Sequence, residues 1–264
     1  MIGRNTTRYF ARIPGAIVLA FLVLPILAVI PASLNDSSFI KVPPANYSSR
    51  WYLAFFADTG WMQSVLVSCS VALIATVLSV VLGTLAALGL ARLSQAWKGV
   101  VSALILAPMI VPVIMTSIAL YYGMRQIHLQ GSIVGLALGH TLLCLPFVVL
   151  NVGVALARFD EGLVRAAAGL GAKPFYIFAT ITLPAIAPGL AAGAAFAFIT
   201  SFDEAVMSLF LAGTGSKTLP VKLWEQIRVE FTPVAAVGST AILVVTLVMF
   251  AFVQFIRSRS SASE

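Results

Sequence analysis

The sequence has little charge. Only 9% of its 264 residues are Asp, Glu, Lys or Arg, and 60% are hydrophobic, whereas an average soluble domain is about 25% charged. The mean hydropathy is +1.03. A soluble globule of this length could not bury so much apolar surface. The composition therefore excludes a soluble fold and indicates a protein that is largely covered by lipid.

The sequence also lacks the motifs of an ATPase or a nucleic-acid-binding protein. It contains no GxxxxGK[ST] phosphate loop, so we do not expect this chain to hydrolyse ATP. The net charge is +7, but the basic residues lie in short segments between apolar runs and are not interleaved with aromatics. We therefore expect no nucleic-acid partner. No nucleophile, base and metal-ligand set converges either, so the sequence predicts no enzyme and no catalytic residue.

Cysteine and histidine are scarce, with two of each. Cys69 and Cys144 lie far apart inside apolar stretches, which is typical of small buried side chains. His128 and His140 have no partners at metal-ligand spacing. We expect a packed or hydrogen-bonded role for His140, and neither a metal nor a cofactor bound to this chain.

Six charge-free apolar windows are each long enough to cross a bilayer, which takes about 20 residues as a helix. They run Ile13–Asn35, Thr59–Ala91, Gly99–Met124, Gln126–Ala157, Pro174–Phe202 and Phe231–Ile256. The fifth helix is expected to continue to about Ala212. The sequence thus predicts an all-α integral membrane protein with six transmembrane helices. A cleaved signal peptide at the first window is disfavoured, because its apolar run is longer than a signal peptide needs.

The basic residues predict the orientation of these helices. Ten lie on the side that holds both termini: Arg4, Arg8, Arg12, Arg92, Lys98, Arg158, Arg165, Lys173, Arg257 and Arg259. Six lie on the other side, in longer segments: Lys41, Arg50, Arg125, Lys217, Lys222 and Arg228. Cytoplasmic loops carry the excess of Lys and Arg, so both termini are predicted to be cytoplasmic.

Two longer segments then lie outside, at about 34–59 and 213–233. In the first, Trp51 is either an anchor at the membrane interface or an aromatic lid over a ligand. In the second, Val221, Trp224 and Ile227 predict a short amphipathic helix on the membrane surface. Small residues also recur four apart, as in Gly189 and Gly193, and favour close helix packing, within the chain or across a dimer face.

The segment 158–184 is the one long cytoplasmic loop. Asp160 and Glu161 are typical of a helix start. Gly171 suits a left-handed helix end, and Pro174 suits the first turn of a second helix. Pro184 is expected to break the chain before the fifth span. The pattern predicts a helical hairpin with exposed apolar residues, which either docks a partner or lies on lipid.

This segment resembles the EAA loop of ABC importer permeases. That signature reads Glu-Ala-Ala, three residues, Gly, nine residues, Ile, one residue, Leu-Pro. The chain has its residues at Ala166, Ala167, Gly171, Ile181, Leu183 and Pro184, with Arg165 in place of the glutamate. Span number, inside termini and loop position are similar to those of the type I (MetI-like) importer permeases over essentially the whole chain, 1–264, treated as one permease domain. The contact made by the missing glutamate is lost or replaced, with Glu161 one turn earlier as a candidate.

The resemblance implies a mechanism and partners. The helix around Ala166 and Ala167 would be the coupling helix, seated in a groove of an ATPase subunit that carries the ATP and Mg²⁺. The chain would pair with a second permease subunit, two ATPase subunits and a periplasmic substrate-binding protein in the inner membrane of a bacterium. The alternative is an ion-coupled secondary transporter, but a transporter of that class has no need of an EAA-like loop.

The nearest branch is similar to the polyamine permeases. The similar segments are Arg50–Tyr52, Cys144–Val149, Phe202–Glu204 and Thr218–Lys222. The branch implies putrescine, spermidine or a related amine as substrate. Spermidine-type members tend to have an acidic residue after the proline of the third span, where this chain has Met109 after Pro108. An opine or another small polar solute therefore stays open.

Asp203 and Glu204 are the acidic residues expected within a span. A carboxylate at membrane depth usually faces a bundle interior or an aqueous path, so these two are candidates for attracting a cationic substrate. Adjacent helical residues point about 100° apart, so only one of them faces the path, and we favour Asp203. The alternative is an ion pair or a helix cap near the outer boundary.

Overall fold

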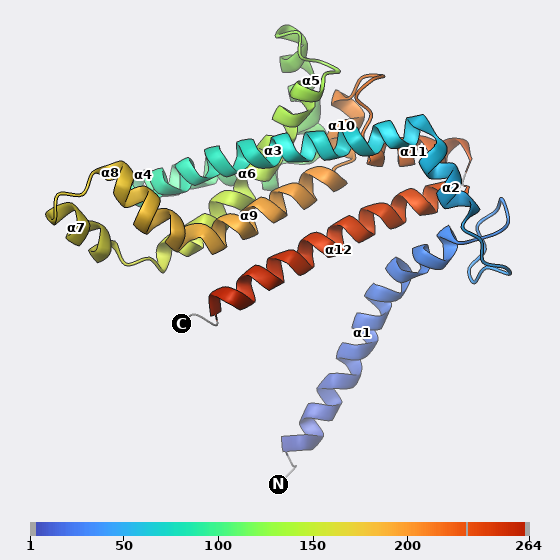
Figure 1. The fold of residues 1–264 in the computed structure, drawn as a ribbon, viewed down its shortest axis with the longest axis horizontal. Helices are drawn as coiled ribbons and strands as arrows, with labels where there is room; N and C mark the ends of the chain where they lie inside the picture. The colour runs from blue at the N-terminus through green and yellow to red at the C-terminus, as the bar shows by residue number, and fades with distance from the viewer. Residues whose placement is uncertain (1–3, 231, 262–264) are drawn as a thin grey trace. The chain divides into compact units, whose positions relative to one another are not determined.

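The computed structural model describes the backbone of residues 4–230 and 232–261 and the side chains of residues 13–230 and 232–255, and every named element in that part is a helix (Figure 1). Its elements are α1 (Arg4–Ser33), α2 (Arg50–Ala57), α3 (Thr59–Arg92), α4 (Gln95–Ile110), α5 (Val113–Gln126), α6 (Ile133–Ala157), α7 (Glu161–Gly169), α8 (Pro174–Ile177), the π-helix η1 (Phe178–Thr182), α9 (Leu183–Asp203), α10 (Val206–Leu211), α11 (Leu219–Val229) and α12 (Pro233–Ser261). The predicted all-α class is confirmed. Phe231, the predicted start of the sixth window, lies outside the described residues.

Five helical segments in the described chain are long and apolar enough to cross a membrane, and a bent pair, α4 with α5, would make a sixth. The third predicted span, Gly99–Met124, is not one continuous helix. It is broken between Ile110 and Val113 with a bend of 100°. Pro112 has no N–H to continue the helix, and the residue before a proline is driven to extended backbone. Val111 accordingly has φ −69° and ψ 131°.

The fifth helix is also shorter than predicted. It ends at Asp203, and residues up to Leu211 form a separate helix, α10, after a break at Glu204 and Ala205. Glu204 is extended, with φ −71° and ψ 109°. The expected continuation to Ala212 is therefore wrong, and the acidic pair lies at a helix break.

The described chain forms two compact units. Unit 1 comprises Met1–Met62 and Leu223–Leu243, and unit 2 comprises Gln63–Lys222 and Val244–Glu264. In unit 1 the rings of Phe55 and Trp61 pack with centroids 5.2 Å apart. The hydroxyls of Ser33 and Tyr52 lie 2.7 Å apart and join the end of α1 to α2.

In unit 2, α6 and α9 pack along an antiparallel seam that repeats every four residues. His140 lies against Ser201, Cys144 against Ala197, and Val148 against Gly193. At Gly193 a Cβ atom would be 3.0 Å from the Val148 Cα. The small residues predicted to favour close packing therefore act within this chain.

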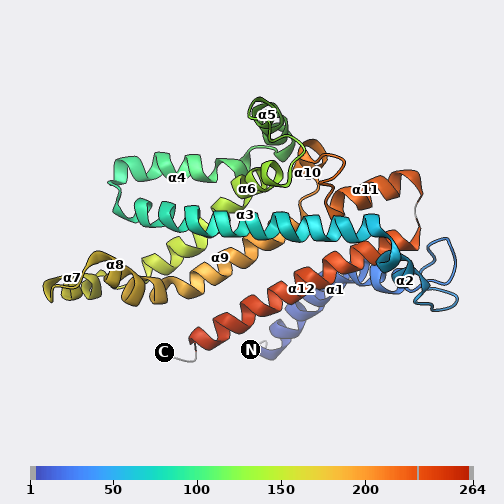
Figure 2. The same ribbon diagram turned by 45° about the horizontal axis from the view of Figure 1, so that its top comes forward.

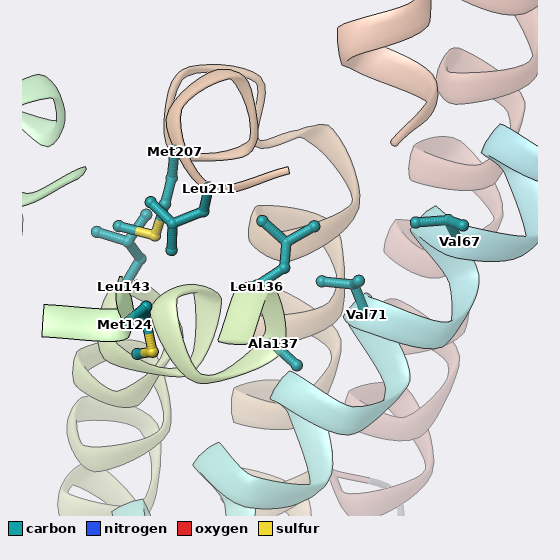
Figure 3. Close-up of a cluster of buried hydrophobic side chains, with 8 residues drawn as sticks. All are labelled: Val67, Val71, Met124, Leu136, Ala137, Leu143, Met207 and Leu211. Atoms are coloured by element: carbon teal, nitrogen blue, oxygen red, sulfur yellow. The ribbon is translucent and has the colours of Figure 1, made fainter. Parts of the chain in front are cut away.

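A second group of buried apolar side chains packs around α10 in unit 2 (Figure 3). Met207 and Leu211 of α10 lie over Leu143 of α6, and both are almost fully buried. A Cβ atom on Gly139 would lie 2.9 Å from the side chains of both. The absence of a side chain at Gly139 therefore brings the short helix against α6.

Within unit 2, the α7–α8 hairpin and α10 lie toward opposite ends of the α6–α9 pair, as both views show (Figures 1 and 2). The long apolar helices α6 and α9 run between these two ends. The two segments singled out from the sequence, 158–184 and 203–204, are thus separated by the length of a span.

Candidate functional site

The α7 helix begins as the sequence predicts. Asp160 is its N-cap, and its carboxylate accepts a hydrogen bond of 2.7 Å from the backbone N–H of Gly162. Glu161 occupies the first turn, where its charge is favourable to the helix dipole. An ion pair of 3.8 Å joins Glu161 to Arg165. The charge of Arg165, which stands where the EAA loop has glutamate, thus has a partner one turn earlier.

The α7 helix ends in a left-handed turn at Gly171, as predicted. Gly171 has φ +85°. The N–H of Ala172 donates to the carbonyl of Ala167 at 3.1 Å, and the N–H of Gly171 donates to Ala168 at 3.0 Å. This pair of bonds is the Schellman motif. A Cβ atom on Gly171 would meet nothing within 4 Å, so the backbone conformation alone requires glycine here.

Pro174 begins α8 in the first helical position, as predicted, but Pro184 does not break the chain. The helix continues from α8 through the π turn η1 into α9, with Pro184 in the first turn of α9. A proline inside an α-helix clashes with the carbonyl four residues earlier. The π turn, in which the N–H of Leu183 donates to Phe178, accommodates the ring without a break.

The π turn also changes which side of the helix is buried. The sequence suggests an apolar side at Phe175, Phe178 and Ile181, but the residues that are buried are Ile177, Thr182 and Ile186. Their spacing of five and then four residues follows the wider turn. Phe175 is consequently 81% exposed.

The hairpin presents an apolar surface with no covering element in the described chain. No residue of α7 is buried. Leu163, Leu170, Phe175 and Tyr176 are all exposed, Leu170 to 90%. Of the residues in the EAA pattern, Ala166, Leu183 and Pro184 are exposed and Ala167 and Ile181 are half-buried. A surface of this kind on a protein is typical of a docking site.

The two carboxylates at the end of α9 have different surroundings. The Glu204 carboxylate accepts a hydrogen bond of 3.0 Å from the N–H of Met207 and so caps the first turn of α10. The Asp203 side chain is exposed and has no hydrogen bond or ion pair to the part of the chain that the structure describes. The cap expected as an alternative role is thus observed for Glu204 only.

His140 is fully buried in α6 and joins the two sides of this break. Its Nδ1 lies 2.8 Å from the Ser201 hydroxyl, and its Nε2 lies 3.0 Å from the Ser208 hydroxyl. The expected hydrogen-bonded role is confirmed. Ser201 and Ser208 are buried partners of His140 that the sequence analysis does not identify. A serine inside an apolar helix is a sign of a buried hydrogen bond, but spacing alone does not identify its partner.

Trp51 lies in unit 1, in the first turn of α2. The guanidinium of Arg50 lies over its ring, 4.6 Å from the centroid. Its indole N–H is buried and has no hydrogen-bond partner among the described residues.

Comparison with known families identifies the chain. Residues 79–261 match the family described as "Binding-protein-dependent transport system inner membrane component". The chain belongs to this family. It is a multi-pass inner-membrane permease of the ABC importer class, a transport protein and not an enzyme.

Individual relatives cover most of this permease. It is 31% identical over 232 residues to the spermidine/putrescine transport system permease protein PotC of Escherichia coli K12, covering 88% of each chain. It is 31% identical over 231 residues to the putrescine transport system permease protein PotI of the same strain, covering 84% of this chain and 82% of PotI. The predicted resemblance to the polyamine branch is confirmed.

A solved structure has the same fold. The permease superposes on a chain of a bacterial ABC transporter involved in the import of the acidic polysaccharide alginate, with a TM-score of 0.75. The superposition covers 97% of this chain and 96% of the other, at 13% sequence identity. The helical arrangement predicted for a type I importer permease is therefore confirmed.

Proposed function

We propose that this permease forms half of the translocation path for a polyamine, putrescine or spermidine, or for a related small amine, in an ATP-driven importer. The observation that carries the proposal is the Asp203 carboxylate. It stands at the end of a membrane-spanning helix, exposed and without a partner among the described side chains. The names of the two polyamine permeases that share 31% of their residues with it support the same substrate class.

Asp203 is a better substrate residue than Glu204. The Glu204 carboxylate is already used by the N–H of Met207, whereas Asp203 is available to an ammonium group. Phe196 lies seven residues before Asp203, on the same face of α9, and its ring stacks on Phe147 with centroids 6.3 Å apart. An aromatic surface below a carboxylate suits a cation with a methylene chain.

The hairpin is the proposed docking site for the ATPase. Its exposed apolar side chains and the ordered turn at Gly171 support a rigid helix that seats in a groove of a partner. In this arrangement Arg165, Ala166 and Ala167 face the ATPase, and Ile181, Leu183 and Pro184 connect the hairpin to α9. ATP and Mg²⁺ would be bound and used on the partner subunits.

The complete importer would contain a second permease subunit of different sequence, two ATPase subunits and a periplasmic binding protein. The hairpin and both termini would be cytoplasmic, and Asp203 would lie in the outer half of the membrane. The basic residues, ten against six, support this orientation, as does the separation of the hairpin from Asp203 within unit 2.

The test is uptake of radiolabelled putrescine and spermidine by the assembled importer. Asp203→Asn removes the charge with little change of shape, and uptake should fall at least about tenfold, the effect of about 1.4 kcal/mol. Glu204→Gln keeps an oxygen that can accept from Met207 and should have a smaller effect. Glu230→Gln, an exposed acid elsewhere, is the control. Uptake by Asp203→Asn at the wild-type rate would refute the cation site.

A further inference from the structure

The break between α9 and α10 is held by one buried side chain. His140 is 0% exposed and reaches Ser201 in the last turn of α9 and Ser208 in α10. Ser201 and Ser208 are buried as well. Between these two contacts lie Asp203 and Glu204. The imidazole thus connects the two helix ends that flank the acidic pair.

Both ring nitrogens of this imidazole have hydrogen-bond partners. Nδ1 lies 2.8 Å from the Ser201 hydroxyl and 3.1 Å from the Ser201 carbonyl oxygen. Nε2 lies 3.0 Å from the Ser208 hydroxyl, and that hydroxyl lies 2.9 Å from the carbonyl oxygen of Glu204. The polar contacts thus run from the last turn of α9 through His140 and Ser208 to the backbone of Glu204.

The contact differs from the packing elsewhere along the seam. One turn below, Cys144 lies against Ala197, and Val148 lies against Gly193. Those positions are closed by small or apolar groups, which suffice to hold two continuous helices together. A break leaves backbone groups without helical partners, and beside this break His140 has a ring nitrogen within hydrogen-bond distance of a serine on each side.

We propose that His140 is a positioning residue that fixes the geometry of the α9–α10 break and thereby the position of the Asp203 carboxylate. It does not touch the substrate. It acts through Ser201 and Ser208, and its effect on uptake rests on the proposed role of Asp203. Its effect on the break itself is independent of the substrate, which allows the two to be tested separately.

The first measurement follows the break directly. A cysteine at Ala205, half-buried in the break, is labelled with a maleimide in the assembled importer. Cys69 is replaced by serine, and Cys144, which is buried, stays. His140→Leu removes both hydrogen bonds and should raise the labelling rate about fivefold or more, as expected for the loss of a buried hydrogen bond. His140→Gln, whose amide can still donate toward Ser208, should restore a rate near that of the parent.

Two further variants separate positioning from general disruption. Thr141→Val is the matched control, because the Thr141 hydroxyl donates only to Ala137 within its own helix, and the labelling rate should not change. Ser208→Ala removes the Nε2 partner together with the bond from the Ser208 hydroxyl to the Glu204 carbonyl, and should raise the rate as His140→Leu does. The double variant should add nothing further, because both changes remove the same connection. Ser208→Ala also provides the test if His140→Leu does not assemble.

The second measurement is uptake at increasing concentrations of loaded binding protein. His140→Leu should lower the maximal rate about fivefold or more, and His140→Gln should recover it. Unchanged labelling in both His140→Leu and Ser208→Ala would overturn the inference. If labelling rises as expected but Asp203→Asn transports normally, the positioning role stands and the proposed cation site fails.

Discussion

Gly189 of α9 lies directly against the backbone of Asn151 in α6, where a Cβ atom would be 2.6 Å from the Asn151 carbonyl oxygen. The same Cβ would be 2.7 Å from the Cβ of Ala155. The close approach of α6 and α9 therefore depends on the absence of a side chain at this position.

Gly189→Ala should separate the two helices and destabilise the permease by about 1–3 kcal/mol, the usual cost of overpacking. The measurement is the thermal midpoint of the purified importer. Gly153→Ala is the control, because Gly153 of α6 faces a cavity of about 560 Å³ between α3, α4 and α6 and its Cβ would meet nothing within 4 Å. The control should be neutral or slightly stabilising. Equal midpoints for both variants would contradict the packing described for the seam.

Gly171→Val should uncouple ATP hydrolysis from uptake. A β-branched residue is strongly disfavoured at φ +85°, so the turn that orients the coupling hairpin would change. ATP hydrolysis by the importer should continue while uptake per ATP falls severalfold. Gly171→Asn, which tolerates the left-handed region, should retain most of the coupling, and so should Gly169→Ala, whose Cβ would meet nothing within 4 Å. Normal coupling in Gly171→Val would count against the proposed role of the hairpin.

A cysteine at Ala166 should cross-link to the ATPase subunit. Ala166 is exposed on α7, next to the exposed Leu163 and Leu170, and would lie at the proposed interface. The reagent is a short bifunctional maleimide applied to the assembled importer in the Cys69→Ser background. Ser94→Cys, exposed in the segment between α3 and α4, is on the same predicted side of the membrane but outside the hairpin and should give no product. A cross-link from Ser94 alone would move the interface away from α7.

The sequence correctly predicts the helices that are defined by apolar runs and by residue types typical of helix ends. The hairpin is the clearest case, since Asp160, Gly171 and Pro174 each act through local backbone chemistry that their residue type specifies. The residues of the EAA pattern, from Ala166 to Pro184, lie in the same segment. These features need no knowledge of what packs against them.

The errors come from proline and from a break that tertiary contacts stabilise. Apolar composition is the same on both sides of Pro112, so it could not reveal the 100° bend between α4 and α5. Pro184 was expected to break the helix, but the π turn absorbs it. The break at Glu204 is stabilised by His140 and Ser208, which are 68 residues apart, and no local pattern connects them.

The uninterrupted helix from Pro174 to Asp203 makes a single lever of 30 residues, about 45 Å long at 1.5 Å per residue. One end of this rod lies at the hairpin and the other at Asp203. If the helix swings as a rigid rod about its hairpin end, a tilt of about 10° shifts the Asp203 end by about 8 Å. A modest rotation at the hairpin is then enough to displace the Asp203 carboxylate, without any signal passing from side chain to side chain.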